Sequence, residues 1–90
     1  IKGWKKHLKM QCILIPVSGD VDVVTYSIES NQFEKFKLNI KDPYRLVIPP
    51  NIIFGFKGNE ISNCILNIGN ILHDPEESLT YNLNEFKYNW

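Results

Sequence analysis

The sequence has few cysteines, little helical periodicity and no excess of either charge. Cys12 and Cys64 are too few for a disulfide framework or a metal cluster, so we expect both in the hydrophobic core. Ten basic side chains balance ten acidic ones, which removes the positive field that collects nucleic acid or anionic lipid. No apolar run approaches a membrane span and no signal peptide is visible, so we predict a cytoplasmic protein without nucleic acid or membrane partners.

The length of the chain predicts one domain over residues 1–90, since 90 residues cannot fill two separate cores. A core this small leaves apolar surface exposed in a monomer, so we expect a homodimer. The sequence begins at Ile1, without an initiator methionine and within a stretch that reads as structured. We therefore expect a single domain that lacks an N-terminal strand segment.

Short runs rich in Val, Ile, Phe and Tyr recur about every ten residues between Gly, Pro, Asn and Asp. This spacing is typical of an antiparallel β-sandwich or β-barrel. The segment 79–90 is amphipathic and aromatic and needs a covering surface. The expected strands are 10–17, 21–28, 33–40, 44–48, 52–56 and 61–71.

The turns between these runs carry their own signals. Gly19 can supply a positive φ, and the strand after it is expected to return antiparallel to the one before. Residues 58–60 are predicted to form a hairpin loop, and residues 41–43 break the strand pattern. Asp74 as a cap and Pro75 at the first helical position predict a single helical turn.

Three stretches, in order, resemble the dTDP-4-dehydrorhamnose 3,5-epimerase family and its sugar-nucleotide cupin relatives. Residues 2–7, Lys-Gly-Trp-Lys-Lys-His, are similar to the family's Arg-Gly-Leu/Trp-His-x-Gln/His strand. Residues 46–56, Leu-Val-Ile-Pro-Pro-Asn-Ile-Ile-Phe-Gly-Phe, are similar to its Ile-Pro-x-Gly-x-x-His-Gly-Phe. Residues 73–77, His-Asp-Pro-Glu-Glu, resemble its acidic turn after the long strand. Together the three motifs span nearly the whole chain.

This resemblance implies a small antiparallel β-barrel or jelly roll of the cupin type, a double-stranded β-helix with the substrate in its mouth. The family reaction removes a proton beside a ketone with a histidine base and returns it from a tyrosine, while a lysine steadies the enolate. Such chemistry needs a base that titrates near the working pH and a group aimed at the developing oxyanion.

The match departs from the family at its catalytic positions. Lys5 stands where the family has its histidine base, and Phe54 stands where the second motif has a histidine. The family's lysine and tyrosine fall near Cys12 and Asn67. Of the metal ligands that other cupins use, only the His7 position keeps a nitrogen donor, so we predict no metal and no cofactor.

Strand alternation puts His7 on the same face as Lys5 and Lys9, either inside the barrel or on an exposed edge strand. Lys2 stands where the family has an arginine that contacts nucleotide phosphates, and a lysine keeps that charge. His73, beside Asp74 in a turn, fits a surface or capping role better than catalysis. The candidate catalytic residues are Lys5 and His7, and the candidate substrate-binding residues are Lys2, Lys9, Arg45, Phe54 and Asn67.

Two hypotheses follow for the function. The first is a sugar-nucleotide epimerase-like cupin of surface-polysaccharide biosynthesis, a 3,5-epimerase or keto-isomerase in which Lys5 or His7 takes the proton. The second is a non-catalytic domain that binds a nucleotide sugar or another carbohydrate and has lost its acid/base groups.

Overall fold

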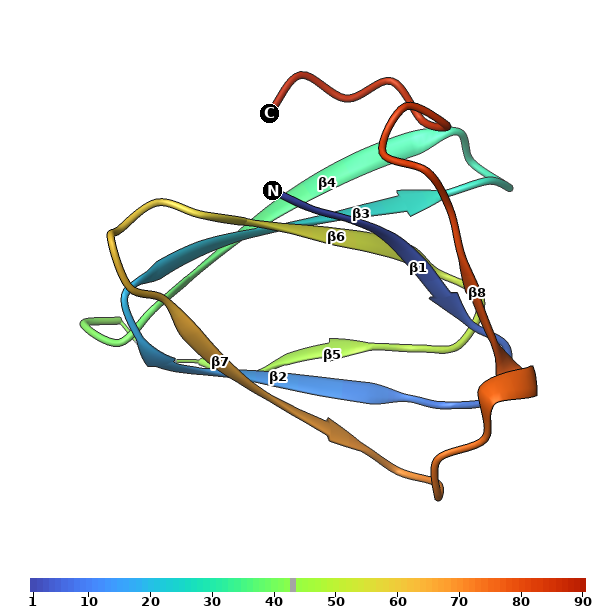
Figure 1. Cartoon of the computed structure of the whole chain (residues 1–90), viewed down its shortest axis with the longest axis horizontal. Helices are drawn as coiled ribbons and strands as arrows, with labels where there is room; N and C mark the ends of the chain where they lie inside the picture. Colours follow the sequence, from blue (N-terminus) through green and yellow to red (C-terminus); the bar gives the residue numbers. More distant parts are fainter. Residues whose placement is uncertain (43) are drawn as a thin grey trace.

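In residues 1–42 and 44–90, the part of the chain that the computed structural model describes, eight strands form two antiparallel sheets (Figure 1). The predicted all-β fold is therefore confirmed. The break predicted at residues 41–43 extends outside this described part. The elements are β1 (Lys2–His7), β2 (Cys12–Ser18), β3 (Asp20–Ser27), β4 (Gln32–Asn39), β5 (Leu46–Ile48), β6 (Ile53–Gly58), β7 (Cys64–Gly69), the 3-10 turn η1 (Pro75–Glu77) and β8 (Ser78–Thr80).

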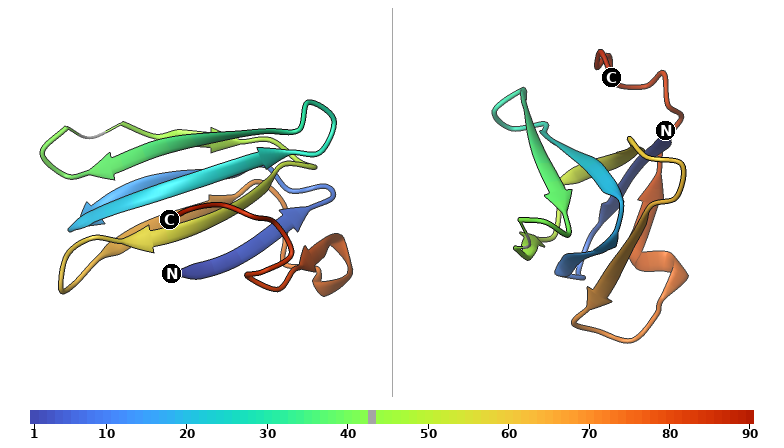
Figure 2. Two further views of the ribbon diagram at one scale, coloured as in Figure 1. Left: turned by 90° about the horizontal axis from the view of Figure 1, so that it is seen from above. Right: turned by 90° about the vertical axis from the view of Figure 1, so that its left-hand side faces the viewer.

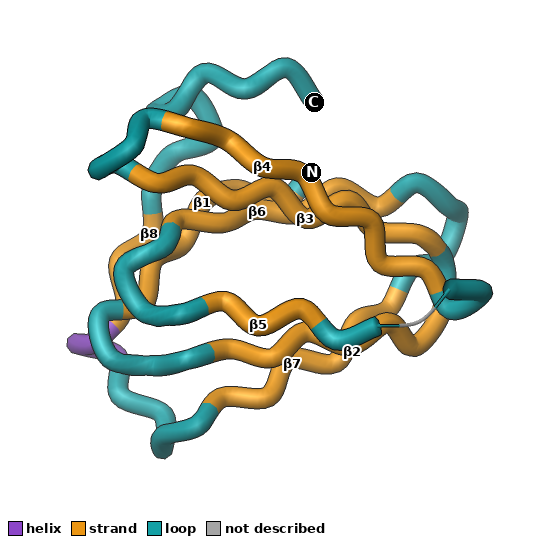
Figure 3. Tube along the Cα trace, turned by 180° about the vertical axis from the view of Figure 1, so that it is seen from behind, coloured by secondary structure: helices purple, strands orange, loops and turns teal. Residues whose placement is uncertain are grey.

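The two sheets lie face to face (Figure 3). One has the strand order β4-β3-β6-β1-β8 and the other the order β5-β2-β7. Strand alternation turns one set of apolar side chains inward, where they exclude water from the space between the sheets. The buried core consists of Cys12, Leu14, Val21, Val23, Leu38, Ile48 and Phe54.

The expectation of a closed barrel is wrong, because the two sheets stay separate. Within the described residues, β7 ends one sheet and β8 ends the other without a ladder between them. β8 has only three residues, Ser78–Thr80, and all three pair with β1. The fold is therefore an open jelly-roll sandwich, in which the side between the edge strands β7 and β8 is not closed by hydrogen bonds.

The hairpin predicted at residues 58–60 is wrong, and the strand after Gly19 does not pair with the strand before it, since both connections carry the chain from one sheet to the other. Gly19 does adopt a positive φ of 80°, but it joins β2 to β3 across the sandwich. The connection from β6 to β7 crosses at the same end, where the Asp20 amide donates to Asn63 Oδ1 at 3.0 Å. A Cβ at Gly19 would lie 2.5 Å from the Ser62 carbonyl oxygen, so this close approach requires glycine.

The aromatic segment 79–90 buries its apolar side chains by covering one face of a sheet. It folds back over the outer face of the five-stranded sheet (Figures 1 and 2). Trp4 is completely buried beneath it, and its indole Nε1 donates to the Leu83 carbonyl at 3.1 Å. Further aromatic side chains packed around Trp4 are Tyr26, Phe33, Tyr81, Phe86, Tyr88 and Trp90.

Among the described residues, no helix is long and apolar enough to cross a membrane.

Candidate functional site

A cleft of about 700 Å³ lies on the open side of the sandwich, with β1 and β8 on one wall and β7 on the other. Five of the seven candidate residues from the sequence line this cleft together with His73 and Tyr81. The structure thus brings together residues that are far apart in the chain. The five are Lys2, Lys5, His7, Phe54 and Asn67.

A β-bulge in β1 sets which side chains reach the cleft. β1 pairs with β6 so that Lys2 lies opposite Phe56 and Lys5 opposite Phe54, with a register shift between them. A bulge adds one residue to a strand, so two residues three positions apart can share a face. Lys2 and Lys5 therefore both border the cleft, while Trp4 packs on the outer face of the sheet under the C-terminal segment.

Phe54 forms part of the wall behind this row of side chains. It is 3% exposed and belongs to the core between the sheets. Its ring stacks against the His7 imidazole, with centroids 6.0 Å apart and an interplanar angle of 22°. The phenyl ring thus restricts the orientation of the histidine ring while it fills the core.

His7 is held by a buried carboxylate from the other end of the chain. Its Nδ1 forms a hydrogen bond with Glu77 Oε1, and the two residues are 9% and 3% exposed. Glu77 Oε2 accepts hydrogen bonds from the backbone amides of Lys9, at 3.1 Å, and Met10, at 3.2 Å. Glu77 therefore fixes the histidine ring and the turn that follows β1 at the same time.

The predicted helical turn, η1, positions the Glu77 carboxylate. Asp74 caps η1, and its Oδ1 accepts from the Glu76 amide at 3.0 Å. Pro75 takes an early position in the turn, as the sequence predicts. Glu77 is the last residue of η1 and precedes β8 directly, so the pairing of β8 with β1 places it beside His7.

The charge of Glu77 decides which ring nitrogen of His7 is available. Burial raises the pKa of Glu77, but hydrogen bonds from His7 and from the Lys9 and Met10 amides outweigh burial and lower it to about 2. An ionised carboxylate only accepts hydrogen bonds, so Nδ1 must carry a proton. Within the described residues nothing hydrogen-bonds Nε2. In a neutral ring, Nε2 therefore keeps a free lone pair beside the cleft.

Two candidate residues do not reach the cleft. Lys9 is exposed in the bend beyond β1, and only its backbone amide contacts Glu77. The alternation that grouped Lys9 with His7 does not apply, because β1 ends at His7. Arg45 is exposed and precedes β5, which borders β2 on the side away from β7.

The cysteines illustrate how far an apolar run predicts burial. Cys12 is 1% exposed, in agreement with the sequence analysis. Cys64 is exposed, because it begins the edge strand β7. An apolar run thus predicts a strand without predicting which of its faces is covered.

Glu77 is the functional candidate that the sequence did not reveal. It lies 70 positions from His7, and no local pattern links the two. The acidic proline turn was the available signal, since it predicts a fixed local geometry around residues 74–77. His73, which the sequence assigned to the surface, is exposed and also borders the cleft.

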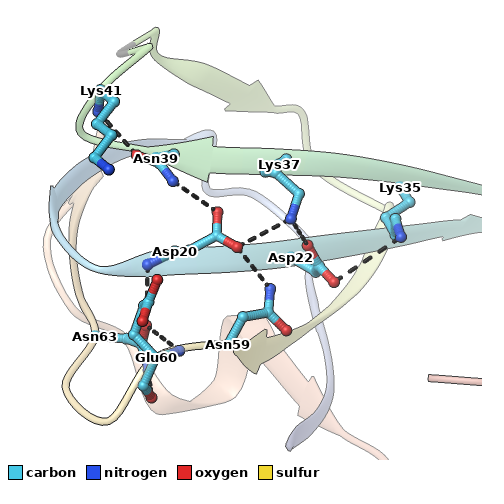
Figure 4. A network of polar contacts seen from close by, with 9 residues as sticks. All are labelled: Asp20, Asp22, Lys35, Lys37, Asn39, Lys41, Asn59, Glu60 and Asn63. Atoms are coloured by element: carbon cyan, nitrogen blue, oxygen red, sulfur yellow. Dashed lines mark hydrogen bonds and ion pairs between the residues drawn. The ribbon is translucent and has the colours of Figure 1, made fainter.

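A second polar cluster lies near the crossover connections, on the five-stranded sheet (Figure 4). Asp20 accepts hydrogen bonds from Lys37 Nζ at 2.9 Å, Asn39 Nδ2 at 3.1 Å and Asn59 Nδ2 at 3.1 Å. The hydrogen bond from Lys37 is the main reason that the pKa of Asp20 is lowered, against the opposing effect of burial. Across residues 1–42 and 44–90, no three His, Cys, Asp or Glu side chains are grouped to hold a metal ion.

The geometry of the chain is similar to that of solved sugar-nucleotide enzymes. A dTDP sugar isomerase from Desulfovibrio desulfuricans superposes with a TM-score of 0.84 and 27% identity, over 93% of this chain and 58% of that one. The chain has the fold of the dTDP-sugar isomerase cupins. The resemblance to the epimerase-like cupin family is thereby confirmed.

Two more distant dTDP-sugar isomerase cupins show the same fold. QdtA, a sugar 3,4-ketoisomerase from Thermoanaerobacterium thermosaccharolyticum solved in complex with TDP, has a TM-score of 0.76 and 18% identity, over 87% of this chain and 55% of that one. WlaRB, a TDP-quinovose 3,4-ketoisomerase from Campylobacter jejuni, has a TM-score of 0.76 and 22% identity, over 89% and 59%. The chain thus spans a little more than half the length of these cupins. No protein-family model and no curated sequence matched it.

Proposed function

We propose that this chain is the core of a sugar-nucleotide isomerase that acts on a dTDP-linked 4-keto deoxysugar, with His7 as the general base. The observation that carries the proposal is the buried Glu77–His7 pair, which leaves Nε2 free beside the cleft. A base fixed by a carboxylate through its other nitrogen is a recurrent arrangement in proton-transfer enzymes. The fold shared with dTDP-sugar isomerases supports the choice of substrate class.

In the proposed reaction, His7 Nε2 removes the proton from the carbon beside the ketone. The electrons of that C–H bond form a carbon–carbon double bond, and the carbonyl π electrons move to oxygen to give an enolate. Delivery of a proton from solvent to the opposite face of the same carbon, with release of the proton on His7 Nε2 to solvent, gives an epimer. Transfer of the neighbouring hydroxyl proton to the enolate oxygen, with return of the carbon-bound proton to the former carbonyl carbon, gives the isomeric ketone. Glu77 stays ionised and stabilises the imidazolium formed between these steps.

The remaining cleft residues suit the other parts of such a substrate. Lys5 lies in the same cleft as His7 and can neutralise the enolate oxygen. Lys2 offers a positive charge to the diphosphate, and the Asn67 amide offers a donor and an acceptor to sugar hydroxyls. His7 is preferred to Lys5 as the base because only His7 has a buried carboxylate partner.

We further propose that the chain works as a homodimer in surface-polysaccharide biosynthesis. Its location would be the cytoplasm, because a doubly charged nucleotide sugar does not cross a lipid bilayer unaided. The proton transfer at His7 does not depend on the homodimer, the pathway or the cytoplasmic location. Each can be tested separately from turnover.

The test is to incubate the protein with a dTDP-4-keto-6-deoxyhexose in deuterium oxide and to follow deuterium at the carbons beside the ketone by NMR. The unmodified protein is expected to incorporate deuterium. His7→Asn should lower the rate by roughly 10²–10⁴-fold, the usual contribution of a general base. His73→Asn is the matched control, because His73 borders the same cleft but is exposed. Absence of exchange in the unmodified protein, or equal loss in both variants, would contradict the proposal.

A non-catalytic sugar-nucleotide-binding domain is the second candidate. It is favoured by Lys5 and Phe54, which stand where the resemblance places histidines. Calorimetric titration with the same nucleotide sugar separates the two candidates. Binding that requires Lys2 but brings no deuterium exchange would favour this second function.

A further inference from the structure

Met10 and Gly69 lie against each other in the cleft that His7 borders. Both residues line the cleft, Met10 from the connection between β1 and β2 and Gly69 from the end of β7. A Cβ at position 69 would lie 2.5 Å from Met10 Sδ and 3.0 Å from Met10 Cε. The thioether therefore packs directly on the glycine backbone, and it connects the β1 side of the cleft to the β7 side.

Space, rather than backbone conformation, requires glycine at position 69. Gly69 does not have a positive φ, in contrast to Gly19. It pairs directly with the buried Cys12, so a side chain at position 69 would point between the sheets, as Cys12 does. The Met10 side chain lies there instead and packs against the core. The absence of a side chain at Gly69 thus admits the methionine.

The backbone of Met10 is bound to the same carboxylate that orients His7. The Met10 amide donates to Glu77 Oε2 at 3.2 Å, and Glu77 Oε1 forms the hydrogen bond with His7 Nδ1. Two hydrogen bonds through one carboxylate therefore link the methionine backbone to the imidazole ring. Because Gly69 also restricts the direction of the side chain, the thioether has a defined place beside the proposed base.

An apolar surface thus lies next to His7 within a cleft that also contains lysines. Phe54 stacks against the histidine ring, and Met10 is linked to it through Glu77. In a 4-keto-6-deoxysugar the one apolar substituent is the methyl group, which is attached to a carbon beside the carbon bearing the ketone oxygen. The methyl group therefore stays close to the base whichever neighbouring carbon of the ketone loses its proton.

We propose that Met10, packed on Gly69, is a specificity-determining residue that contacts the methyl group of a 6-deoxysugar. A thioether and a methyl group gain dispersion contacts when they meet and exclude water. A hydroxymethyl group in the same place would give up hydrogen bonds to water and find no partner in Met10 or Phe54. The inference rests on the proposed function for the position of the sugar in the cleft, but not on proton transfer by His7.

The test is calorimetric titration of the full chain with dTDP-6-deoxyglucose, dTDP-glucose and dTDP-xylose. These nucleotide sugars differ only in the group on C5, which is methyl, hydroxymethyl or hydrogen, and none has a ketone that would react. The unmodified protein should bind the 6-deoxysugar about 10–100-fold more tightly than either of the others, the usual effect of one methylene or hydroxyl group in an apolar site. The quantity compared is this ratio of affinities, which a general loss of stability does not change.

Three variants assign the preference to the methionine. Met10→Gln keeps the length of the side chain but replaces the thioether with an amide, so most of the preference for methyl over hydroxymethyl should be lost. Met10→Leu remains apolar and should retain it. Leu66→Gln is the matched control, because it makes an equivalent apolar-to-amide change on β7 at an outward position that is 49% exposed and does not border the cleft. Its ratio of affinities should equal that of the unmodified protein.

Equal affinities of the unmodified protein for dTDP-6-deoxyglucose and dTDP-glucose would overturn the inference, as would a preference that Met10→Gln leaves intact. If Met10→Gln does not fold, Gly69→Ala decides, because its Cβ displaces the thioether and should also reduce the preference. An unchanged ratio in Gly69→Ala would then overturn the inference. Failure to bind any of the three nucleotide sugars would overturn both this inference and the proposed substrate class. A methyl preference without deuterium exchange would overturn only the isomerase reaction.

Discussion

Two buried carboxylates, Glu77 and Asp20, have similar burial but different partners. Glu77 is 3% exposed and binds the ring of His7, which has a second nitrogen beside the cleft. Asp20 is 8% exposed and is surrounded by donors from Lys37, Asn39 and Asn59. Neither Lys37 nor the two amides border the large cleft.

The difference shows that a buried charge is not by itself a sign of catalysis. Asp20 receives the side chain of Lys37 from β4, and its backbone binds Asn59 and Asn63 from the second crossover connection. Asp20 thus joins β3 to β4 and to the connection between β6 and β7, and it does not border the cleft that His7 lines. Glu77 also supports backbone amides, but its histidine partner can still exchange a proton with a ligand.

The largest expected effect is a loss of deuterium exchange when Glu77, but not Asp20, is replaced. Glu77→Gln removes the charge that keeps the proton on His7 Nδ1, so the deuterium-exchange rate should fall by about 10²–10⁴-fold. Asp20→Asn is the matched control and should leave the exchange rate of the folded protein unchanged. Similar losses in both variants would mean that Glu77, like Asp20, acts only through stability.

The next effect concerns stability at the crossover end. Gly19→Ala places a Cβ where φ is +80° and where the Ser62 carbonyl oxygen lies 2.5 Å away. The free energy of unfolding should fall by about 1–3 kcal/mol, measured by urea denaturation. The exchange rate per folded molecule should not change, because Gly19 does not border the cleft. A stability equal to that of the unmodified protein would show that the two connections approach less closely than described.

The stability of the protein should fall at acidic pH, in part because Glu77 becomes protonated. Its pKa is lowered from 4.5 to about 2 in the folded state, so its stabilising effect is present above pH 4.5 and is lost as the pH falls toward 2. Thermal unfolding between these values should show a steep decline that is flatter in Glu77→Gln. Asp20→Asn should also flatten the decline, since the pKa of Asp20 is lowered too. An equally steep decline in Glu77→Gln would contradict the lowered pKa.

Local features of this fold could be predicted from the sequence because they depend on neighbouring residues. Period-two alternation located the strands to within a few residues, for example β4 at Gln32–Asn39 against a predicted 33–40. Gly19 has its predicted positive φ, and Asp74 caps its predicted turn. These outcomes follow from backbone preferences that act over a few positions.

Features that depend on distant contacts could not be predicted in this way. Alternation shows that a strand has an inner face but not which strand lies beside it, so the crossover at residues 58–60 was mistaken for a hairpin and the change of sheet at Gly19 was not predicted. The bulge that brings Lys2 and Lys5 to one face has no sequence signature in β1. Glu77 was missed for the same reason, since its role arises from the pairing of β8 with β1.

The most direct test of the central claim is the protonation of the two His7 ring nitrogens, measured by nitrogen-15 NMR in a pH titration without substrate. When the ring is neutral, we expect a proton on Nδ1 and a bare Nε2, with loss of this preference in Glu77→Gln. A neutral ring with its proton on Nε2, or a tautomer that Glu77→Gln leaves unchanged, would contradict the account.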